Sequence, residues 1–299
     1  MLSVVICTHN PRRDYFQRCL DGLKCQTLPY ENWELIVIDN RSDEPVGSWV
    51  DPSWHPIARI VREEKLGLTP ARLRGIHECK GDPLVFVDDD NVLDPAFLET
   101  TVKIAGEKQF LGAWSGQCRP EFEQQPPEWT RRYWGLLAIR EFERDSWSNL
   151  PHLTETLPIG AGLCVRREVA LHYLHLHDSG QRSFQTDRTG RLLFSCGDHD
   201  LAACACDVGL GTGSLAALKL THLMRPERFT AEYLARLFEG TSYSGAIVNY
   251  FRGLRPVRRS ALRRLVDFIR LMRLKEPHRG ILKAESRGRA RAAEYLSKQ

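Results

Sequence analysis

The sequence predicts an α/β protein in which a mostly parallel, Rossmann-like central sheet is flanked by helices and followed by a C-terminal helical extension. Short apolar runs alternate with amphipathic segments along the first third of the chain, as in successive βαβ units. Polar residues follow three of the predicted strands directly, and this is where open α/β sheets bind ligands. A chain of 299 residues with 42% apolar residues is long enough for one large domain and a smaller appendage.

The first elements follow from hydrophobic periodicity. Strands are expected at residues 3–8, 33–38, 57–61 and 84–87, and helices at residues 14–25 and 70–79. The first helix would turn Tyr15, Leu20 and Leu23 toward the core. Since strand–helix–strand crossovers are right-handed, these units would form one parallel sheet.

The predicted strand at 84–87 ends in three adjacent acids, Asp88, Asp89 and Asp90. Adjacent carboxylates repel one another, so a fold keeps such a cluster mainly where a cation or hydrogen-bond donors neutralise it. One interpretation is a carboxylate pair that holds a divalent metal ion and a nucleotide. The alternative is a solvated acidic loop in which Asn91 and Asp94 cap the next helix.

The other two strand ends carry Thr8-His9-Asn10 and Asp39-Asn40-Arg41. Loops at one edge of a sheet converge, so all three clusters can reach one ligand. No G-x-G-x-x-G follows the first strand and no G-x-x-x-x-G-K-[ST] occurs in the chain, which argues against a dinucleotide dehydrogenase and a P-loop enzyme.

The middle of the chain departs from this rhythm. Five aromatic residues are concentrated here between prolines, namely Trp114, Trp129, Tyr133, Trp134 and Trp147. Aromatic faces stack on sugar rings, so an acceptor site is one interpretation, and core packing is the other. Gly160 and Gly162 follow and allow close approach of the backbone.

Four segments occur in the order and at the spacing of a known family: Ser3-Val4-Val5-Ile6-Cys7-Thr8-His9-Asn10, Leu35-Ile36-Val37-Ile38-Asp39-Asn40-Arg41-Ser42, Gly67-Leu68-Thr69-Pro70-Ala71-Arg72 and Val87-Asp88-Asp89-Asp90. They resemble the family 2 glycosyltransferases, nucleotide-sugar-dependent enzymes with the GT-A fold. The resemblance covers most of residues 1 to about 240. It implies that Thr8 and Asn10 line the base pocket, that Asp39 hydrogen-bonds the base, and that Arg72 contacts the base or the pyrophosphate. A solvated or ion-paired helical arginine is the alternative for Arg72.

The resemblance also implies a Mn²⁺ or Mg²⁺ cofactor. Asp88 would hold the ribose or the metal ion, and Asp90 would coordinate the ion. Asp89 is grouped with the nucleotide-binding residues, although in an extended backbone its side chain would point the other way. His222 is the last residue of a predicted strand at 218–222. Many relatives have a histidine there, and His222 would complete the metal shell unless it is structural.

A second acidic segment lies at Ser195-Cys196-Gly197-Asp198-His199-Asp200-Leu201, ahead of an Ala- and Cys-rich helix. It resembles the family's Glu-Asp-x-Asp/Glu segment, which implies that Asp198 is the base that deprotonates the acceptor, with Asp200 nearby as support. Helix N-capping is the alternative for Asp198. Gly197 stands where the family usually has Glu. By the same resemblance, the turn with Gly160 and Gly162 would lie beside the donor sugar.

The C-terminal part differs in charge. Residues 251–299 contain fifteen Lys and Arg but four Asp and Glu, a local net charge of +11 in a chain with a net charge of +4. Apolar residues recur there at helical spacing with arginines between them: Leu262, Leu265, Val266, Ile269, Met272, Arg258, Arg259, Arg263, Arg264, Arg270 and Arg273. Such a helix at 258–273 would lie on an anionic membrane surface or pack on the domain, and nucleic-acid binding is not expected.

Together these features predict a metal-dependent, inverting glycosyltransferase of the hexosyltransferase type, because an inverting displacement needs a single base. A nucleotide-sugar donor and a glycan or lipid-linked acceptor are its expected partners. Its expected domains are residues 1–240, divided near residue 110 into nucleotide-binding and acceptor halves, and the basic extension 241–299. A sugar-phosphate nucleotidyltransferase and a non-catalytic glycan- or membrane-binding module are the alternatives.

The expected location is the cytoplasm, with the inner face of the membrane as an additional possibility. Nine cysteines, an odd number, are typical of reduced thiols rather than of a disulfide framework. The opening strand has neither the basic flank nor the length of a secretory signal, and no apolar run reaches 18 residues.

Overall fold

The central sheet has the alternating βα connectivity that the sequence predicts. The structure is a computed structural model that describes residues 1–151, 153, 155–182, 184, 193–254, 262, 266, 269 and 271–298. The strands of this part are β1 Leu2–Thr8, β2 Trp33–Asp39, β3 Ala58–Arg62, β4 Leu84–Asp88, β5 Asn91–Leu93, β6 Leu111–Phe122, β7 Ser146–Ser148, β8 Leu163–Val165 and β9 Gly211–Met224. Its α-helices are α1 Arg13–Lys24, α2 Leu68–Glu78, α3 Phe97–Glu107, α4 Arg167–Asp178, α5 Gly197–Asp207, α6 Ala231–Phe251 and α8 His278–Leu296. Short 3₁₀ helices lie at η1 Tyr30–Asn32, η2 Val46–Ser48, η3 Glu128–Leu137 and η4 Pro226–Phe229.

The strands form one sheet in the order β3-β2-β1-β4-β8-β6-β9-β5, and β7 also pairs with β9. The neighbours β3, β2, β1 and β4 are parallel, while β8 is antiparallel to both β4 and β6. The elements predicted for the first third therefore all form, with ends within two residues of the prediction. The carboxyl ends of β1, β2 and β4 meet at one edge of the sheet, and this edge carries the site described below.

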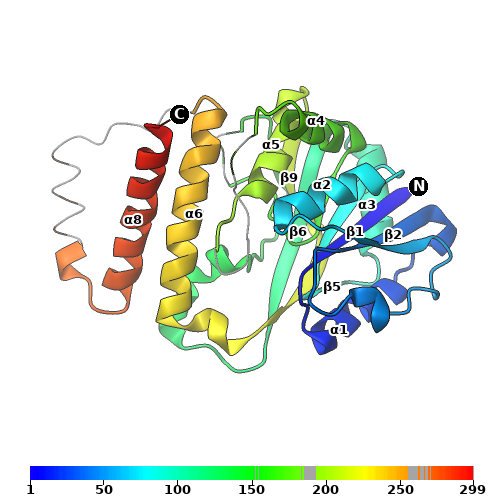
Figure 1. Cartoon of the computed structure of the whole chain (residues 1–299), viewed down its shortest axis with the longest axis horizontal. Coiled ribbons are helices and arrows are strands. Elements are labelled where there is room, and N and C mark those ends of the chain that lie inside the picture. The colour runs from blue at the N-terminus through cyan, green and yellow to red at the C-terminus, as the bar shows by residue number, and fades with distance from the viewer. Residues whose placement is uncertain are drawn as a thin grey trace.

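Each face of the sheet is covered by helices, as Figure 1 shows. Along β1, Val4 and Ile6 pack in the cluster that contains Phe16 of α1, while Val5 packs in the cluster that contains Tyr173 of α4. This alternation follows from the two-residue period of a strand. Helices α1 and α3 thus cover one face, and α2, α4 and α5 cover the other.

The C-terminal helices α6 and α8 lie side by side at the end of the molecule farthest from β2 in Figure 1. A methyl group on Gly288 of α8 would come within 2.2 Å of the backbone oxygen of Glu239, so the two helices approach closely there. Arg287 and Arg291 form ion pairs with the Glu239 carboxylate. The boundary expected at residue 240 falls inside α6, because a change of charge along a chain does not coincide with the end of a helix.

The structure describes only part of the predicted basic helix at 258–273. Leu262, Val266, Ile269 and Met272 are 71%, 52%, 43% and 61% exposed. Leu265 and the arginines at 258, 259, 263, 264 and 270 lie outside the described residues. Among the described helices, none is both long enough and apolar enough to span a bilayer.

Candidate active site

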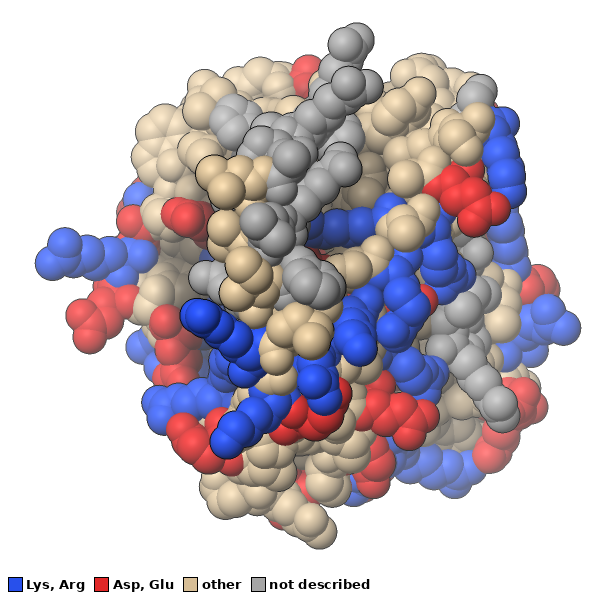
Figure 2. Space-filling model, turned by 90° about the vertical axis from the view of Figure 1, so that its left-hand side faces the viewer, with Lys and Arg blue, Asp and Glu red and all other residues tan. Residues whose placement is uncertain are grey.

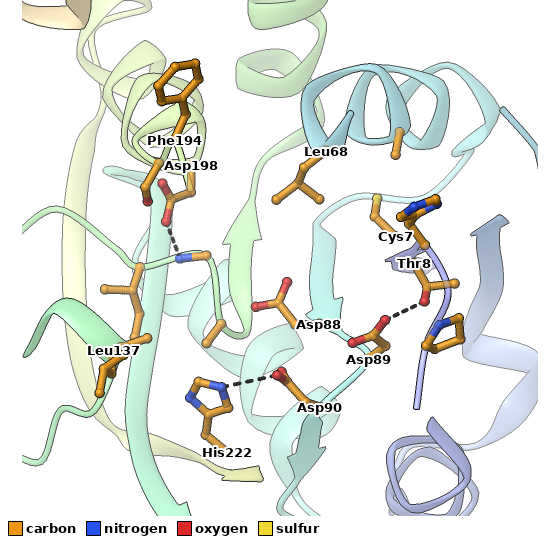
Figure 3. Close-up of a pocket in the computed structure, with 18 of the residues that line it drawn as sticks. Cys7, Thr8, Leu68, Asp88, Asp89, Asp90, Leu137, Phe194, Asp198 and His222 are labelled. Carbon is orange, nitrogen blue, oxygen red and sulfur yellow. Dashed lines mark hydrogen bonds and ion pairs between the residues drawn. The ribbon is translucent and has the colours of Figure 1, made fainter. Parts of the chain in front are cut away.

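A cavity of about 400 Å³ opens where the strands of the parallel half end. One wall comes from the ends of β1 and β4 and the start of α2, and the opposite wall from residues 135–138, 159–161 and the start of α5. Figure 3 shows Thr8 and the three acids Asp88, Asp89 and Asp90 across this space from Asp198. Separate loops therefore converge on one site, as the sequence predicts.

The acid cluster lines the cavity with all three of its members. Asp88 is the last residue of β4, and the chain then turns at Asp89 and Asp90. The expectation that Asp89 points away is wrong, because it assumed an extended backbone at a place where the chain turns. The Thr8 hydroxyl donates a hydrogen bond to Asp89. Burial and the charge of Asp90 raise the pKa of Asp89 above its ordinary value.

Asp90 lies deeper and faces His222, near the end of β9, and Arg228, which follows that strand. Its Oδ2 atom is 2.6 Å from Nη2 of Arg228 and 3.5 Å from Nε2 of His222. Arg228 Nη1 lies 2.9 Å from the same His222 nitrogen. The three side chains are largely buried, and Figure 3 shows His222 facing Asp90. The structure thus brings the two predicted metal ligands together, with an arginine beside them.

Asp90 and His222 fit a divalent metal ion in chemistry and in spacing. Arginine only donates hydrogen bonds, so the His222 Nε2 atom that faces Arg228 presents a lone pair. This is the neutral imidazole that binds metals, and the carboxylate of Asp90 offers the oxygen that Mn²⁺ and Mg²⁺ prefer. The other ring nitrogen, Nδ1, is buried and has no hydrogen-bond partner in the described part of the chain.

Asp198 lies in the first turn of α5, where its carboxylate is held on both oxygens. Oδ2 accepts a hydrogen bond of 2.7 Å from the backbone N–H of Gly160, and Oδ1 accepts one of 2.9 Å from the backbone N–H of His199. The residue at the helix N-cap is Cys196, at φ 101°, so the capping interpretation of Asp198 is wrong. Burial alone would raise the pKa of Asp198, but the charges of His199 and Arg72 and the two N–H groups lower it below its ordinary value.

Gly160 and Arg72 surround this carboxylate. A methyl group on Gly160 would lie 3.0 Å from both Asp198 Oδ2 and Arg72 Nη2, so a larger residue would push into the pair. Arg72 is 4% exposed and lines the cavity from α2, which contradicts the solvated alternative for this residue. The turn that contains Gly160, the arginine from α2 and the candidate base therefore meet at one point of the cavity lining.

Three predicted site residues do not reach the cavity. The Asp39 carboxylate accepts hydrogen bonds from the backbone of Ser42 and Val46 and from Arg62, so it holds the turn after β2. Asn40, the next residue, lines the cavity instead.

Gly162 and Asp200 are the other two. A methyl group on Gly162 would meet Leu220 at 2.7 Å, and its φ of +65° suits glycine, so it serves packing and backbone geometry. Asp200 lies two residues after Asp198 on a helix and faces away from it. Its carboxylate binds Arg182 and Arg252 at 2.9 and 2.7 Å.

Asn10 lines the cavity at the end of β1, and its amide bonds to Asp43 across the strand ends. Sequence reasoning missed several residues of the cavity wall, four of which lie late in the chain. Arg225 and Arg228 follow the end of β9, and Leu237 and Thr241 belong to α6. The two arginines come soon after His222 in the chain, so their proximity to a predicted metal ligand could have marked them as candidate site residues. The two α6 residues had no local signal, because only packing brings this helix to the cavity.

The sequence profile described as "Glycosyl transferase family 2" matches residues 3–163. A relative from Haloferax volcanii, "Glucosyl-dolichyl phosphate glucuronosyltransferase", is 27% identical over 175 residues, which are 57% of this chain and 54% of the relative. In this and other curated relatives, the match covers between 12% and 54% of the relative's own length.

Two solved structures share the fold. Residues 1–349 of TarS from S. aureus, in complex with UDP-GlcNAc, match with a TM-score of 0.58 at 14% identity, over 95% of this chain and 79% of that one. GalNAc-T7 with UDP, GalNAc and Mn²⁺ matches with a TM-score of 0.54 at 15% identity, over 90% of this chain and 54% of that one. The sheet and its flanking helices are therefore of the GT-A type.

Proposed function

Because the chain belongs to glycosyltransferase family 2, we propose that it moves a sugar from a nucleoside-diphosphate donor to a hydroxyl group, with inversion at the anomeric carbon. The observation that carries this proposal is the placement of Asp198 across one cavity from Asp88, Asp89 and Asp90. A donor between these walls would have its leaving group beside the acid cluster and its anomeric carbon toward Asp198.

The donor nucleotide would bind at the strand ends. Thr8, Asn10 and Asn40 line that part of the cavity, with Asp88 and Asp89 next to them. Arg72 and Arg225 add positive charge to the cavity wall, which favours a diphosphate. The complexes of TarS with UDP-GlcNAc and of GalNAc-T7 with UDP support a nucleotide-sugar donor for this fold.

Asp90 and His222 would hold the divalent ion, Mn²⁺ or Mg²⁺. Such an ion supplies positive charge to the departing diphosphate when it is bound. The Mn²⁺ of the GalNAc-T7 complex supports a metal in this fold. The arginines that line the cavity also contribute positive charge toward the departing diphosphate.

Asp198 would act as the base. Its lowered pKa keeps it ionised at neutral pH, and the N–H groups of Gly160 and His199 hold the carboxylate toward the cavity. As the acceptor hydroxyl attacks the anomeric carbon, its proton passes to Asp198 and the diphosphate leaves on the opposite side. Because one base suffices for this single displacement, the product would have the inverted configuration.

We place the acceptor at the apolar end of the cavity and propose that it is lipid-linked. Leu137 and Phe194 line this end on the side of Asp198, Leu237 also lines the cavity, and these side chains favour an acceptor with apolar groups. A lipid also appears in the name of the Haloferax volcanii relative.

The surface of the C-terminal extension supports the same class of acceptor. Four exposed apolar side chains lie at helical spacing: Leu262, Val266, Ile269 and Met272. Figure 2 shows Lys and Arg gathered on the face that carries α8. Apolar side chains beside basic ones favour an anionic membrane surface. The nine free cysteines support the cytoplasmic side of such a membrane.

Calorimetric titration with UDP, GDP, TDP and CDP, with and without Mn²⁺, tests the donor site. We expect one nucleoside diphosphate to bind in a metal-dependent way and Asp90→Asn to abolish that dependence. Its sugar derivatives then serve as donors for product analysis by NMR. A product with the donor's own anomeric configuration, or a covalent sugar–protein adduct, would refute inversion. Failure of all four nucleotides to bind would refute the donor site.

A further inference from the structure

The side chain of Arg228 lies where a cation shared by Asp90 and His222 would bind. Arg228 belongs to η4, and only 12% of its side chain is exposed. One guanidinium nitrogen is 2.6 Å from Asp90 Oδ2, and the other is 2.9 Å from His222 Nε2. Asp90 Oδ2 and His222 Nε2 are the two atoms that would hold the proposed divalent metal ion.

A metal ion and the guanidinium cannot hold these two atoms at once. The two ligand atoms are 3.5 Å apart, close enough that both would hold the same divalent ion. In the structure, Arg228 Nη2 already donates a hydrogen bond to Asp90 Oδ2, and Nη1 donates one to the lone pair of His222 Nε2. An ion placed there would meet the fixed positive charge of Arg228 at close range, in a buried place where water screens charge poorly.

Arg228 has another partner within reach once it leaves Asp90. It lines the same cavity as Arg225 and Arg72, where the diphosphate of a donor would lie. Bidentate contact with phosphate oxygens is a common use of arginine. The guanidinium can therefore pass from the carboxylate to the diphosphate without being left unpaired in a buried place.

We infer that Arg228 competes with the divalent metal ion for Asp90 and His222, so that the ion binds fully only after the guanidinium has moved away. This inference rests on the proposed function, because it concerns the proposed metal site. Without the ion, the positive charge of Arg228 compensates the negative charge of Asp90, and its second N–H group donates a hydrogen bond to His222 Nε2. With a nucleoside diphosphate in the cavity, Arg228 is drawn off and the affinity for the ion rises.

The test measures the affinity of the full chain for Mn²⁺ alone. The electron paramagnetic resonance signal of the free ion reports how much Mn²⁺ is unbound during the titration. Arg228→Gln should bind Mn²⁺ about tenfold or more tightly than the wild type, because a competing positive charge has gone. Arg225→Gln is the matched control. It removes the same charge from the same cavity, but Arg225 is exposed and the structure gives it no hydrogen bond to Asp90 or His222. We expect its Mn²⁺ affinity to stay within about twofold of the wild type.

Equal or weaker Mn²⁺ binding by Arg228→Gln would overturn the inference, and so would an equal gain in Arg225→Gln. Arg228→Lys provides a second variant if Arg228→Gln does not fold, and circular dichroism establishes folding for each. Lysine keeps the positive charge but cannot contact Asp90 and His222 at once as the guanidinium does. The Mn²⁺ affinity of Arg228→Lys should therefore lie between those of the wild type and Arg228→Gln.

Asp90→Asn separates this inference from the proposed function. If it removes Mn²⁺ binding while wild type and Arg228→Gln bind equally, only the competition is refuted. If none of these proteins binds Mn²⁺, the proposed metal site is refuted as well.

Discussion

The backbone N–H of Gly160 donates a 2.7 Å hydrogen bond to the carboxylate of Asp198, across 38 residues of sequence. The bond joins the turn before β8 to the first turn of α5, and both line the cavity. It fixes the direction of the carboxylate and helps to keep it ionised. The position of the candidate base therefore depends on a residue without a side chain.

Asp198→Asn should abolish turnover without abolishing donor binding. An amide cannot take the acceptor's proton, so we expect kcat to fall by about 100- to 10,000-fold. Initial rates with the donor that the nucleotide titration identifies measure this, and calorimetry measures the affinity for the nucleotide. Loss of nucleotide affinity with unchanged kcat would contradict the assignment of Asp198 as the base.

Asp200→Asn tests the neighbouring acid that faces away from the cavity. Its carboxylate joins Arg182 and Arg252, and these three side chains are at most 8% exposed. Removing the charge takes an ion-pair partner from both buried arginines and leaves Arg252 only its pair with Asp207, so the free energy of unfolding should fall by about 3–5 kcal/mol. Denaturant titration measures the loss. A large fall in kcat with unchanged stability would show instead that Asp200 acts in the reaction.

Gly160→Ala should lower the rate more than the stability. Its methyl group would lie 3.0 Å from Asp198 Oδ2 and Arg72 Nη2, and we expect the displaced carboxylate to cost about 10- to 100-fold in kcat.

Gly162→Ala is the matched comparison. Its φ is +65° and its methyl group would meet Leu220 at 2.7 Å, so we expect a loss of about 1–3 kcal/mol in the free energy of unfolding. Rates of the folded protein and denaturant titrations separate the two effects. The reverse pattern in the two variants would contradict the positions assigned here.

His55 should make the protein less stable as the pH falls. Burial lowers the pKa of its imidazole from 6.5 to about 4, and the side chain packs on Trp33 and Trp54. Below pH 6.5 the unfolded chain takes up a proton that the folded chain refuses until the pH approaches 4. The contribution of His55 to the free energy of unfolding should therefore fall by about 2 kcal/mol between pH 7 and pH 5.

Denaturant titration of wild type and His55→Gln at several pH values isolates the contribution of His55 to the pH dependence of the free energy of unfolding. We expect the pH dependence to be shallower in the variant whatever its absolute stability. Identical slopes in the two proteins would show instead that the pKa of His55 is the same in the folded and unfolded chain.

Leu262→Gln with Met272→Gln should weaken binding to anionic vesicles. Both side chains are exposed on the proposed membrane-facing helix, at 71% and 61%. Loss of two apolar side chains should reduce the fraction bound by about tenfold or more. Flotation with equal parts phosphatidylglycerol and phosphatidylcholine at physiological salt measures it. Val102→Gln is the control, because Val102 is 43% exposed on α3. Absence of wild-type binding would refute the membrane proposal.

Sequence alone determined the βα order of the first third and placed Thr8, Asn10 and the three acids at strand ends. These features are local in the sequence. Hydrophobic periodicity predicts each strand, and the polar residues that follow it indicate where the strand ends. The same reasoning singled out Asp198 and His222, because the family's segments are contiguous in the chain.

Only the tertiary structure decided which of these residues face the cavity. Asp39 and Asp200 look like site residues in the sequence, yet Asp39 turns toward Arg62 of β3 and Asp200 toward Arg182 and Arg252. Arg228 meets Asp90 across 138 residues, and α6 reaches the cavity through packing alone. The direction of a side chain depends on contacts between distant segments, and a one-dimensional pattern does not contain those contacts.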